Sequence, residues 1–151
     1  MFESDIAPHP FGSLITVQAL LQQFSTLQHW EERYRQLIIL GRKLPELDDV
    51  YKLAEIEIEG CENRLWLGHK YRKDGTLHFY GSSEGRIVRG LLAVLLTAIE
   101  GKSARQLREN DPLILFRELG LWDQLSISRN AGLVALAAAV KRAAERHYPP
   151  D

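Results

Sequence analysis

The chain has 151 residues, and its 19 basic and 20 acidic side chains give a formal net charge of −1. This balance excludes a general electrostatic attraction to nucleic acid or to an anionic membrane. An apolar fraction of 45% at this length predicts one domain, residues 1–151, with a core of its own. The single cysteine suits a reducing compartment, and the sequence shows neither a signal-peptide pattern nor an apolar stretch long enough to span a bilayer. We therefore expect a soluble, cytoplasmic protein with no membrane partner.

An extended arm and two helices are predicted for the first third of the chain. Residues 1–12 carry two prolines and form the arm. The first helix has apolar residues at helical spacing between Val17 and Phe24, and the second ends at Gly41. The N-cap candidates are Ser13 and Thr16 for the first helix and Ser25 and Thr26 for the second.

A short helix and a strand are expected before the only cysteine, Cys61. Asp48 or Asp49 can start the helix, which runs to Leu53. Residues 56–59 alternate between isoleucine and glutamate, a pattern typical of a half-buried strand. This strand leads to Cys61.

A β-hairpin is predicted after the cysteine. Residues 65–72 and 76–80 alternate between two faces, and the Asp-Gly pair at positions 74–75 is typical of a tight hairpin turn. Residues 81–85 form a loop. The helix that follows, residues 86–100, is apolar on nearly every side and is therefore expected at the centre of the core.

Three further helices complete the predicted fold. Ser103 can cap the first, and Asp111 followed by proline starts the second, which ends at Gly120. Ser126 or Ser128 caps the last helix. The predicted fold class is α+β, with a small antiparallel sheet of about three strands flanked by helices.

Any sulfur chemistry must depend on Cys61, because it is the only cysteine of the chain. One thiol can neither close an internal disulfide nor supply the several thiolates of a structural zinc site. Gly60 can adopt a positive φ, which would place the thiol at a tight bend where backbone N–H groups stabilise a thiolate. Arg64 would add positive charge, and Glu62 would oppose it. The alternative is a buried cysteine that acts only as a small apolar side chain.

Two other classes of function remain open from the residues alone. A stand-alone thiol enzyme needs a histidine within hydrogen-bond reach of the sulfur, and the candidates are His69 and His78. A pure adaptor would keep the cysteine structural and dock a partner through Trp30, Tyr34 or Arg129. The sequence has no phosphate-binding loop and no closely spaced histidine or cysteine pair, so we expect no metal and no cofactor of its own.

Four segments stand in an order and spacing that match a known family. They are residues 30–38 (WEERYRQLI), 60–66 (GCENRLW), 83–92 (SEGRIVRGLL) and 125–133 (LSISRNAGL). Together they resemble the SufE family of sulfur-acceptor proteins, most closely its CsdE branch. The resemblance runs from about His9 to the last helix, which is nearly the whole chain.

The resemblance implies a sulfur carrier rather than an enzyme. In this family the motif cysteine, here Cys61, takes persulfide sulfur from a pyridoxal-phosphate cysteine desulfurase, which would be a CsdA- or SufS-like partner. The carrier stimulates that desulfurase and relays sulfur onward, to iron–sulfur cluster assembly or related sulfur trafficking. The implied fold is that of the iron–sulfur scaffold proteins. Many SufE members have serine where this chain has Asn63, as in the CsdE branch, and this departure leaves the identity of the desulfurase open.

The expected site consists of a loop around the thiol and a surface that meets the partner, whose sulfur must reach Cys61. The loop that supports Cys61 is expected to comprise Gly60, Glu62, Asn63, Arg64 and Trp66. The expected partner contacts are Ser83, Glu84, Gly85 and Arg129. Because an open persulfide would be lost to small thiols, we expect apolar neighbours, including Trp66 and residues 81–85, to shield Cys61 until a partner binds and the thiol swings out.

Overall fold

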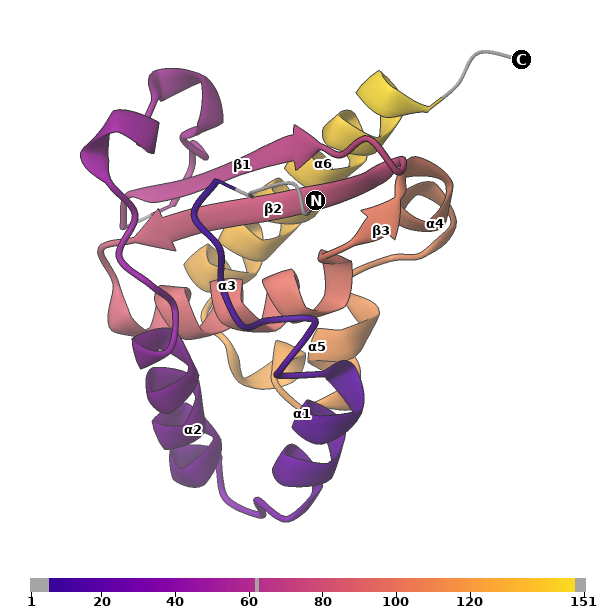
Figure 1. Ribbon diagram of the computed structural model, residues 1–151. Helices are drawn as coiled ribbons and strands as arrows, with labels where there is room; N and C mark the ends of the chain where they lie inside the picture. The colour runs from indigo at the N-terminus through magenta and orange to yellow at the C-terminus, as the bar shows by residue number, and fades with distance from the viewer. Residues whose placement is uncertain (1–5, 62, 149–151) are drawn as a thin grey trace.

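In the computed structural model, the described residues are 6–61 and 63–148. This part of the chain contains six α-helices, three short 3-10 turns and one three-stranded antiparallel sheet (Figure 1). The predicted α+β class is confirmed. In chain order the elements are α1 (Val17–Ser25), α2 (Trp30–Arg42), η1 (Asp49–Tyr51), η2 (Ala54–Ile56), β1 (Leu65–Tyr71), β2 (Thr76–Ser83), α3 (Arg86–Ile99), β3 (Lys102–Ser103), α4 (Ala104–Glu109), α5 (Ile114–Glu118), η3 (Trp122–Gln124) and α6 (Ile127–His147).

The hairpin forms where the alternation predicts it. β1 pairs antiparallel with β2, and Leu65 lies opposite Ser83. At the turn, the Asp74 carboxylate accepts hydrogen bonds from the backbone N–H and the hydroxyl of Thr76, at 3.0 and 2.7 Å. β2 is longer than predicted, because residues 81–83 pair with the start of β1 instead of forming a loop.

The third strand of the sheet is not the one predicted. The strand expected at residues 56–59 is wrong, because η2 takes up its first residue and Glu57 makes only an isolated bridge, to Trp66. The alternation of isoleucine and glutamate in the sequence reflects burial without a strand, since Ile58 is buried and Glu59 beside it is exposed. The third strand is the two-residue β3, which pairs antiparallel with the start of β2.

The helix α3 forms the centre of the core, as predicted. Nine of its fourteen residues are buried, and it packs against both α2 and β2. The expected end of α2 at Gly41 is wrong, since the helix continues to Arg42. A Cβ atom on Gly41 would lie 2.9 Å from the backbone nitrogen of Gly90, so this glycine allows two helices to approach closely rather than ending one of them.

Three of the predicted helix caps are confirmed. The Thr16 side chain accepts a hydrogen bond from the Ala19 N–H at 3.1 Å and starts α1. Ser103 and Gln106 form a capping box at the start of α4, and Ser126 caps α6. Each of these caps is a local interaction, which is why the sequence alone predicts it.

Asp48, predicted to start a short helix, is confirmed as a cap as well, whereas the caps expected at residues 25–26 and at residue 111 are displaced. Ser25 and Thr26 close α1, and α2 begins only at Trp30. The short helix expected between Asp48 and Leu53 is the 3-10 turn η1, with Asp48 as its cap. The helix expected from position 112 begins at Ile114, because the Asp111 carboxylate accepts a hydrogen bond from the N–H of residue 113 in a preceding turn.

The described part of the N-terminal arm crosses in front of β2 and then passes in front of α3 on its way to α1 (Figure 1). The ring of His9 donates a hydrogen bond to the backbone oxygen of Phe79 at 2.7 Å, and Phe11 is fully buried. In the same view α6 passes behind the hairpin, while α1 and α2 lie at the end of the molecule away from the sheet. Among the described residues, none of the helices combines the length and the apolar character that crossing a membrane requires.

Candidate functional site

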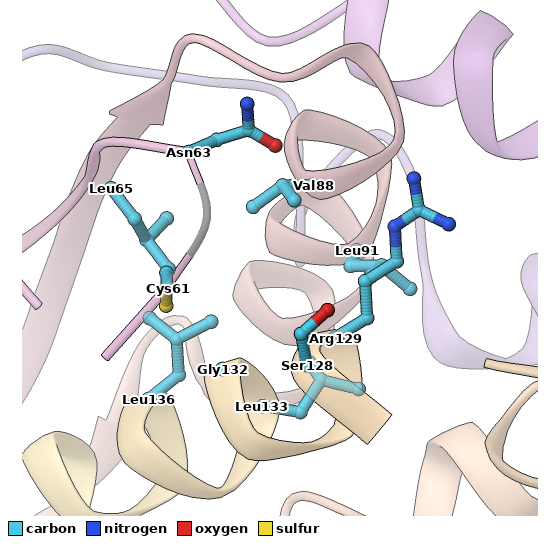
Figure 2. A pocket seen from close by; sticks show the side chains of 10 residues that line it. All are labelled: Cys61, Asn63, Leu65, Val88, Leu91, Ser128, Arg129, Gly132, Leu133 and Leu136. Carbon is cyan, nitrogen blue, oxygen red and sulfur yellow. The ribbon is translucent and has the colours of Figure 1, made fainter. Parts of the chain in front are cut away.

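Cys61 lies in the loop between η2 and β1, directly after a sharp bend. Gly60 has a φ of +89°, a left-handed conformation that glycine adopts without the steric cost that a side chain would bring. Figure 2 shows the sulfur directed at α6, with Gly132 and Leu136 beside it. The loop therefore turns the thiol inward, towards the last helix.

The thiol occupies a small and largely apolar pocket between three parts of the fold (Figure 2). The pocket leaves about 20 Å³ of free space, which is close to the volume that one water molecule needs. The residues that line it are Asn63 and Leu65 at the start of the hairpin, Val88 and Leu91 of α3, and Ser128, Arg129, Gly132, Leu133 and Leu136 of α6. Cys61 is partly buried in this pocket, in agreement with the shielding that we expected.

The side chains that line the pocket differ from those predicted. Trp66 and residues 81–85 are absent from the described lining, so the expectation that they shield the thiol is wrong. Side chains alternate across a strand, so the side chain of Leu65 reaches the pocket and that of Trp66 does not. On this side of the pocket, the residues that line it are Val88 and Leu91 of α3, and not the loop that precedes this helix.

Burial raises the pKa of the Cys61 thiol above its ordinary value. At neutral pH the thiol is therefore protonated, and a thiol is a far weaker nucleophile than a thiolate. The expectation that the surroundings of Gly60 and Arg64 stabilise a thiolate does not hold for this conformation. The pocket holds the thiol in its less reactive form.

The positive charge of Arg64 pairs with Glu57, and not with the Cys61 thiol as expected. Its guanidinium donates two hydrogen bonds to the Glu57 carboxylate, at 2.8 and 3.1 Å, and lies 4.8 Å from the ring centroid of Trp66. The ring of Trp66 is buried, and the ammonium of Lys52 lies 5.3 Å from its centroid. Arg64 and Trp66 thus brace the strand that follows the cysteine. Glu62, the remaining residue predicted for this loop, lies outside the described residues.

The structure places the Ser83–Gly85 segment against the cysteine loop. The Ser83 hydroxyl donates a hydrogen bond to the carbonyl of Arg64 at 2.7 Å, and the N–H of Glu84 donates to the same carbonyl at 3.1 Å. A Cβ atom on Gly85 would overlap the side-chain amide of Asn63. Glu84, in the middle of this segment, is exposed.

Arg129 connects the pocket to the first resembling segment. It lines the pocket from α6, and its guanidinium donates a short hydrogen bond to the hydroxyl of Tyr34. The ring of Tyr34 in turn packs edge-on against Trp30, with the ring centroids 4.7 Å apart. The three residues proposed for an adaptor surface thus form one chain of contacts that ends at the thiol pocket.

The two histidines considered for Cys–His catalysis are engaged elsewhere. The ring nitrogen Nε2 of His69 lies 3.0 Å from Nε2 of His147, and the ring of His147 stacks on Tyr71 at 4.4 Å. His78 is buried, with one ring nitrogen 2.6 Å from the Glu100 carboxylate. No histidine is among the described residues that line the Cys61 pocket, so the structure gives no support to a built-in catalytic base.

His9, His78 and Glu100 form the only group of three potential metal ligands that the described residues contain. The ring of His78 faces two oxygen atoms, one of the Glu100 carboxylate and one of the backbone carbonyl of Ile6. The Arg72 guanidinium places a positive charge 3.1 Å from the same carboxylate. This charge already compensates the carboxylate and opposes a bound cation.

Glu100 is the centre of this polar network. Although burial opposes its ionisation, hydrogen bonds from His78, His9 and the backbone of Phe79 lower the pKa of Glu100 to about 2. The carboxylate is therefore ionised at neutral pH, and it holds the arm, β2 and the end of α3 together. We assign this group a structural role.

Apart from Arg129, sequence reasoning did not identify the α3 and α6 residues of the pocket, because they meet Cys61 only through the tertiary fold. One local signal was available. Gly132 lies inside the long helix α6, where glycine is unfavourable, so its presence points to a packing reason. The structure supplies that reason, since the sulfur of Cys61 lies against this glycine.

Most of the chain is similar to one family of known proteins. The family described as "SufE: Fe-S metabolism associated domain" matches residues 18–144. The protein named "Sulfur acceptor protein CsdE" from Escherichia coli is 55% identical over 140 residues, which cover 93% of this chain and 95% of that protein. An uncharacterized SufE-like protein of Rhizobium meliloti is 34% identical, over 90% of this chain and 99% of the other.

A solved structure supports the fold. The solution structure of a hypothetical protein from Thermus thermophilus superposes with a TM-score of 0.68 at 20% identity, and covers 87% of this chain and 94% of that one. At this identity the likeness concerns the fold alone. With the family match over most of its length and the high identity to CsdE, this chain belongs to the SufE family.

Proposed function

We propose that this protein is a sulfur acceptor and carrier, in which Cys61 takes persulfide sulfur from a cysteine desulfurase and relays it onward. The observation that carries the proposal is the partly buried thiol in an apolar pocket, with no described histidine lining it. Such a thiol lacks the base needed for turnover by itself. The sulfur-acceptor name of its 55% identical relative supports the same interpretation.

The reaction is a thiol exchange in which oxidation states balance. The Cys61 thiolate attacks the outer sulfur of the desulfurase persulfide and a new sulfur–sulfur bond forms on Cys61, while the sulfur–sulfur bond of the desulfurase persulfide breaks and the desulfurase cysteine leaves as a thiolate. The proton that Cys61 loses compensates for the one that the leaving thiolate takes up. The pyridoxal phosphate belongs to the desulfurase, and this chain contributes the acceptor sulfur.

The partner must also change the environment of the thiol. In its pocket Cys61 is protonated and partly covered, so attack requires the loop to move outward. Leaving the pocket removes the burial that raises the pKa of the thiol. We propose that docking on the cysteine loop, Ser83–Gly85 and Arg129 drives this movement, that the carrier thereby stimulates the desulfurase, and that both proteins act in the cytoplasm.

Desulfurase turnover tests this function and separates it from the alternatives. We expect the protein to increase sulfide or alanine production by a CsdA- or SufS-like desulfurase, and Cys61→Ser to remove the increase while leaving binding largely intact. An adaptor would stimulate equally with Cys61→Ser. A stand-alone thiol enzyme would turn over a substrate without the desulfurase.

A further inference from the structure

Gly132 of α6 lies directly beneath the Cys61 sulfur. A Cβ atom built on Gly132 would lie 3.0 Å from Sγ of Cys61, closer than a carbon and a sulfur atom ordinarily approach. Apart from the neighbouring residues and the nearby backbone of α6 itself, Sγ is the one atom of the described residues that such a Cβ would meet within 4 Å. The missing side chain of this glycine therefore leaves room for the sulfur.

The position of Gly132 within α6 is unfavourable for glycine. Gly132 is buried and stands six residues into a helix of 21 residues, where glycine is the least favourable residue apart from proline. Its φ lies outside the left-handed region, so its backbone does not require glycine. Alanine would be expected here on helix propensity alone, and contact with the sulfur is the feature that argues against it.

A second glycine makes a similar contact on the other side of the loop. Gly85 has a φ of −93° and a ψ of 135°, a conformation open to any residue, yet a Cβ atom there would overlap the Asn63 amide. Asn63 lines the same pocket as Cys61. The cysteine loop thus rests on two side-chain-free positions, one under Cys61 and one under Asn63.

We propose that Gly132, assisted by Gly85, is a positioning residue that sets how deeply the Cys61 thiol sits and hence how often the loop is open. This inference rests on the proposed sulfur-carrier function. A methyl group on Gly132 would push the sulfur outward by several tenths of an ångström. The helix is fixed by its own hydrogen bonds while the cysteine lies in a loop, so the loop is the part that gives way.

The test is the rate at which iodoacetamide alkylates Cys61 in the isolated protein. Gly132→Ala should raise this rate at neutral pH by about threefold or more, because the open state becomes more populated and the thiol less desolvated. The midpoint of the rate against pH should also shift downward. Val134→Ala is the matched control, since it likewise improves helix propensity in α6 but replaces a half-exposed side chain outside the described lining of the pocket.

Two results would overturn the inference. One is an unchanged or slower alkylation rate in Gly132→Ala with the fold intact by circular dichroism, which would mean that the sulfur turns within its pocket. The other is an equal increase in Val134→Ala. Should Gly132→Ala fail to fold, Gly85→Ala provides the same test through Asn63. Because no desulfurase is present, this outcome is independent of whether sulfur transfer itself succeeds.

Discussion

The guanidinium of Arg129 donates a hydrogen bond to the hydroxyl of Tyr34, a residue 95 positions earlier in the chain. This bond joins the start of α6 to α2 at the rim of the pocket that holds Cys61. Residues 30–38 and 125–133, two of the four segments that carry the family resemblance, are thus in direct contact. Both belong to the framework that covers the thiol.

Loss of the Arg129 side chain should uncover this pocket. Arg129→Ala removes one wall and its bond to Tyr34, so we expect faster alkylation of Cys61 and a loss of about 1–2 kcal/mol in the free energy of unfolding, measured in urea. Lys141→Ala removes an exposed cation from the same helix and serves as the control. Equal alkylation rates in the two variants would contradict the covering role.

The reactivity of Cys61 should depend on pH in a direction set by burial. Since burial raises the pKa of the thiol above its ordinary value of 9.0, the alkylation rate of the folded protein should still be rising at pH 9. In protein unfolded by urea, the midpoint of the alkylation rate against pH should fall back to the ordinary pKa of a cysteine thiol. By the same linkage, this thiol stabilises the fold below pH 9.0, and the contribution is lost as pH rises through the folded pKa. A folded-state midpoint below the unfolded one would contradict the protonated resting state.

Glu100→Gln should weaken the fold at neutral pH. It leaves His78 and Arg72 without their carboxylate, and we expect a loss of about 2–4 kcal/mol in the free energy of unfolding. Because the pKa of Glu100 is lowered from 4.5 to about 2, its contribution is present above pH 4.5 and disappears as pH falls through about 2.

The difference between wild type and Glu100→Gln should therefore shrink below pH 4.5. Denaturant titrations at several pH values measure it, with the exposed Glu118→Gln as a control that should match wild type throughout. A difference that stays constant down to pH 2 would show that the carboxylate is not the stabilising group.

His69 should titrate below its ordinary range. Burial, together with the nearby His147 and Arg146, lowers the pKa of His69 from 6.5. A base with a lowered pKa stabilises the fold above pH 6.5, and this contribution is lost as the pH falls through the folded value. Titration by nuclear magnetic resonance should give a midpoint below 6.5 that rises in His147→Ala. A midpoint unchanged by that substitution would contradict the coupling.

Local signals in the sequence predict much of this fold. The Asp-Gly turn, the capping residue Ser103 and the apolar helix expected at residues 86–100 each act through neighbours a few positions away. All three are confirmed, with the helix ending at Ile99. The errors come from long-range packing. Gly41 is typical of a helix end in the sequence, but in the structure it allows α2 to pack closely against α3. The strand expected at residues 56–59 does not form, because this segment pairs with a neighbouring strand only through the isolated bridge between Glu57 and Trp66.

In the candidate site, too, the local features could be predicted from the sequence and the long-range packing could not. The thiol and its bend at Gly60 could be predicted, and the resemblance placed Arg129 near the partner, which stays a prediction. The pocket lining could not be predicted, because Val88, Leu91 and Leu136 meet Cys61 only when α3 and α6 pack against one loop. Burial of the thiol, which decides its pKa, follows from that packing.

The most direct test of the account is to locate the transferred sulfur. The protein is incubated with an active cysteine desulfurase and cysteine, trapped with an alkylating reagent, digested, and the peptide that contains Cys61 is analysed by mass spectrometry. We predict that this peptide gains the mass of one sulfur atom on Cys61, and that protein incubated without the desulfurase does not. A Cys61 peptide that carries no extra sulfur while the desulfurase turns over would contradict the account.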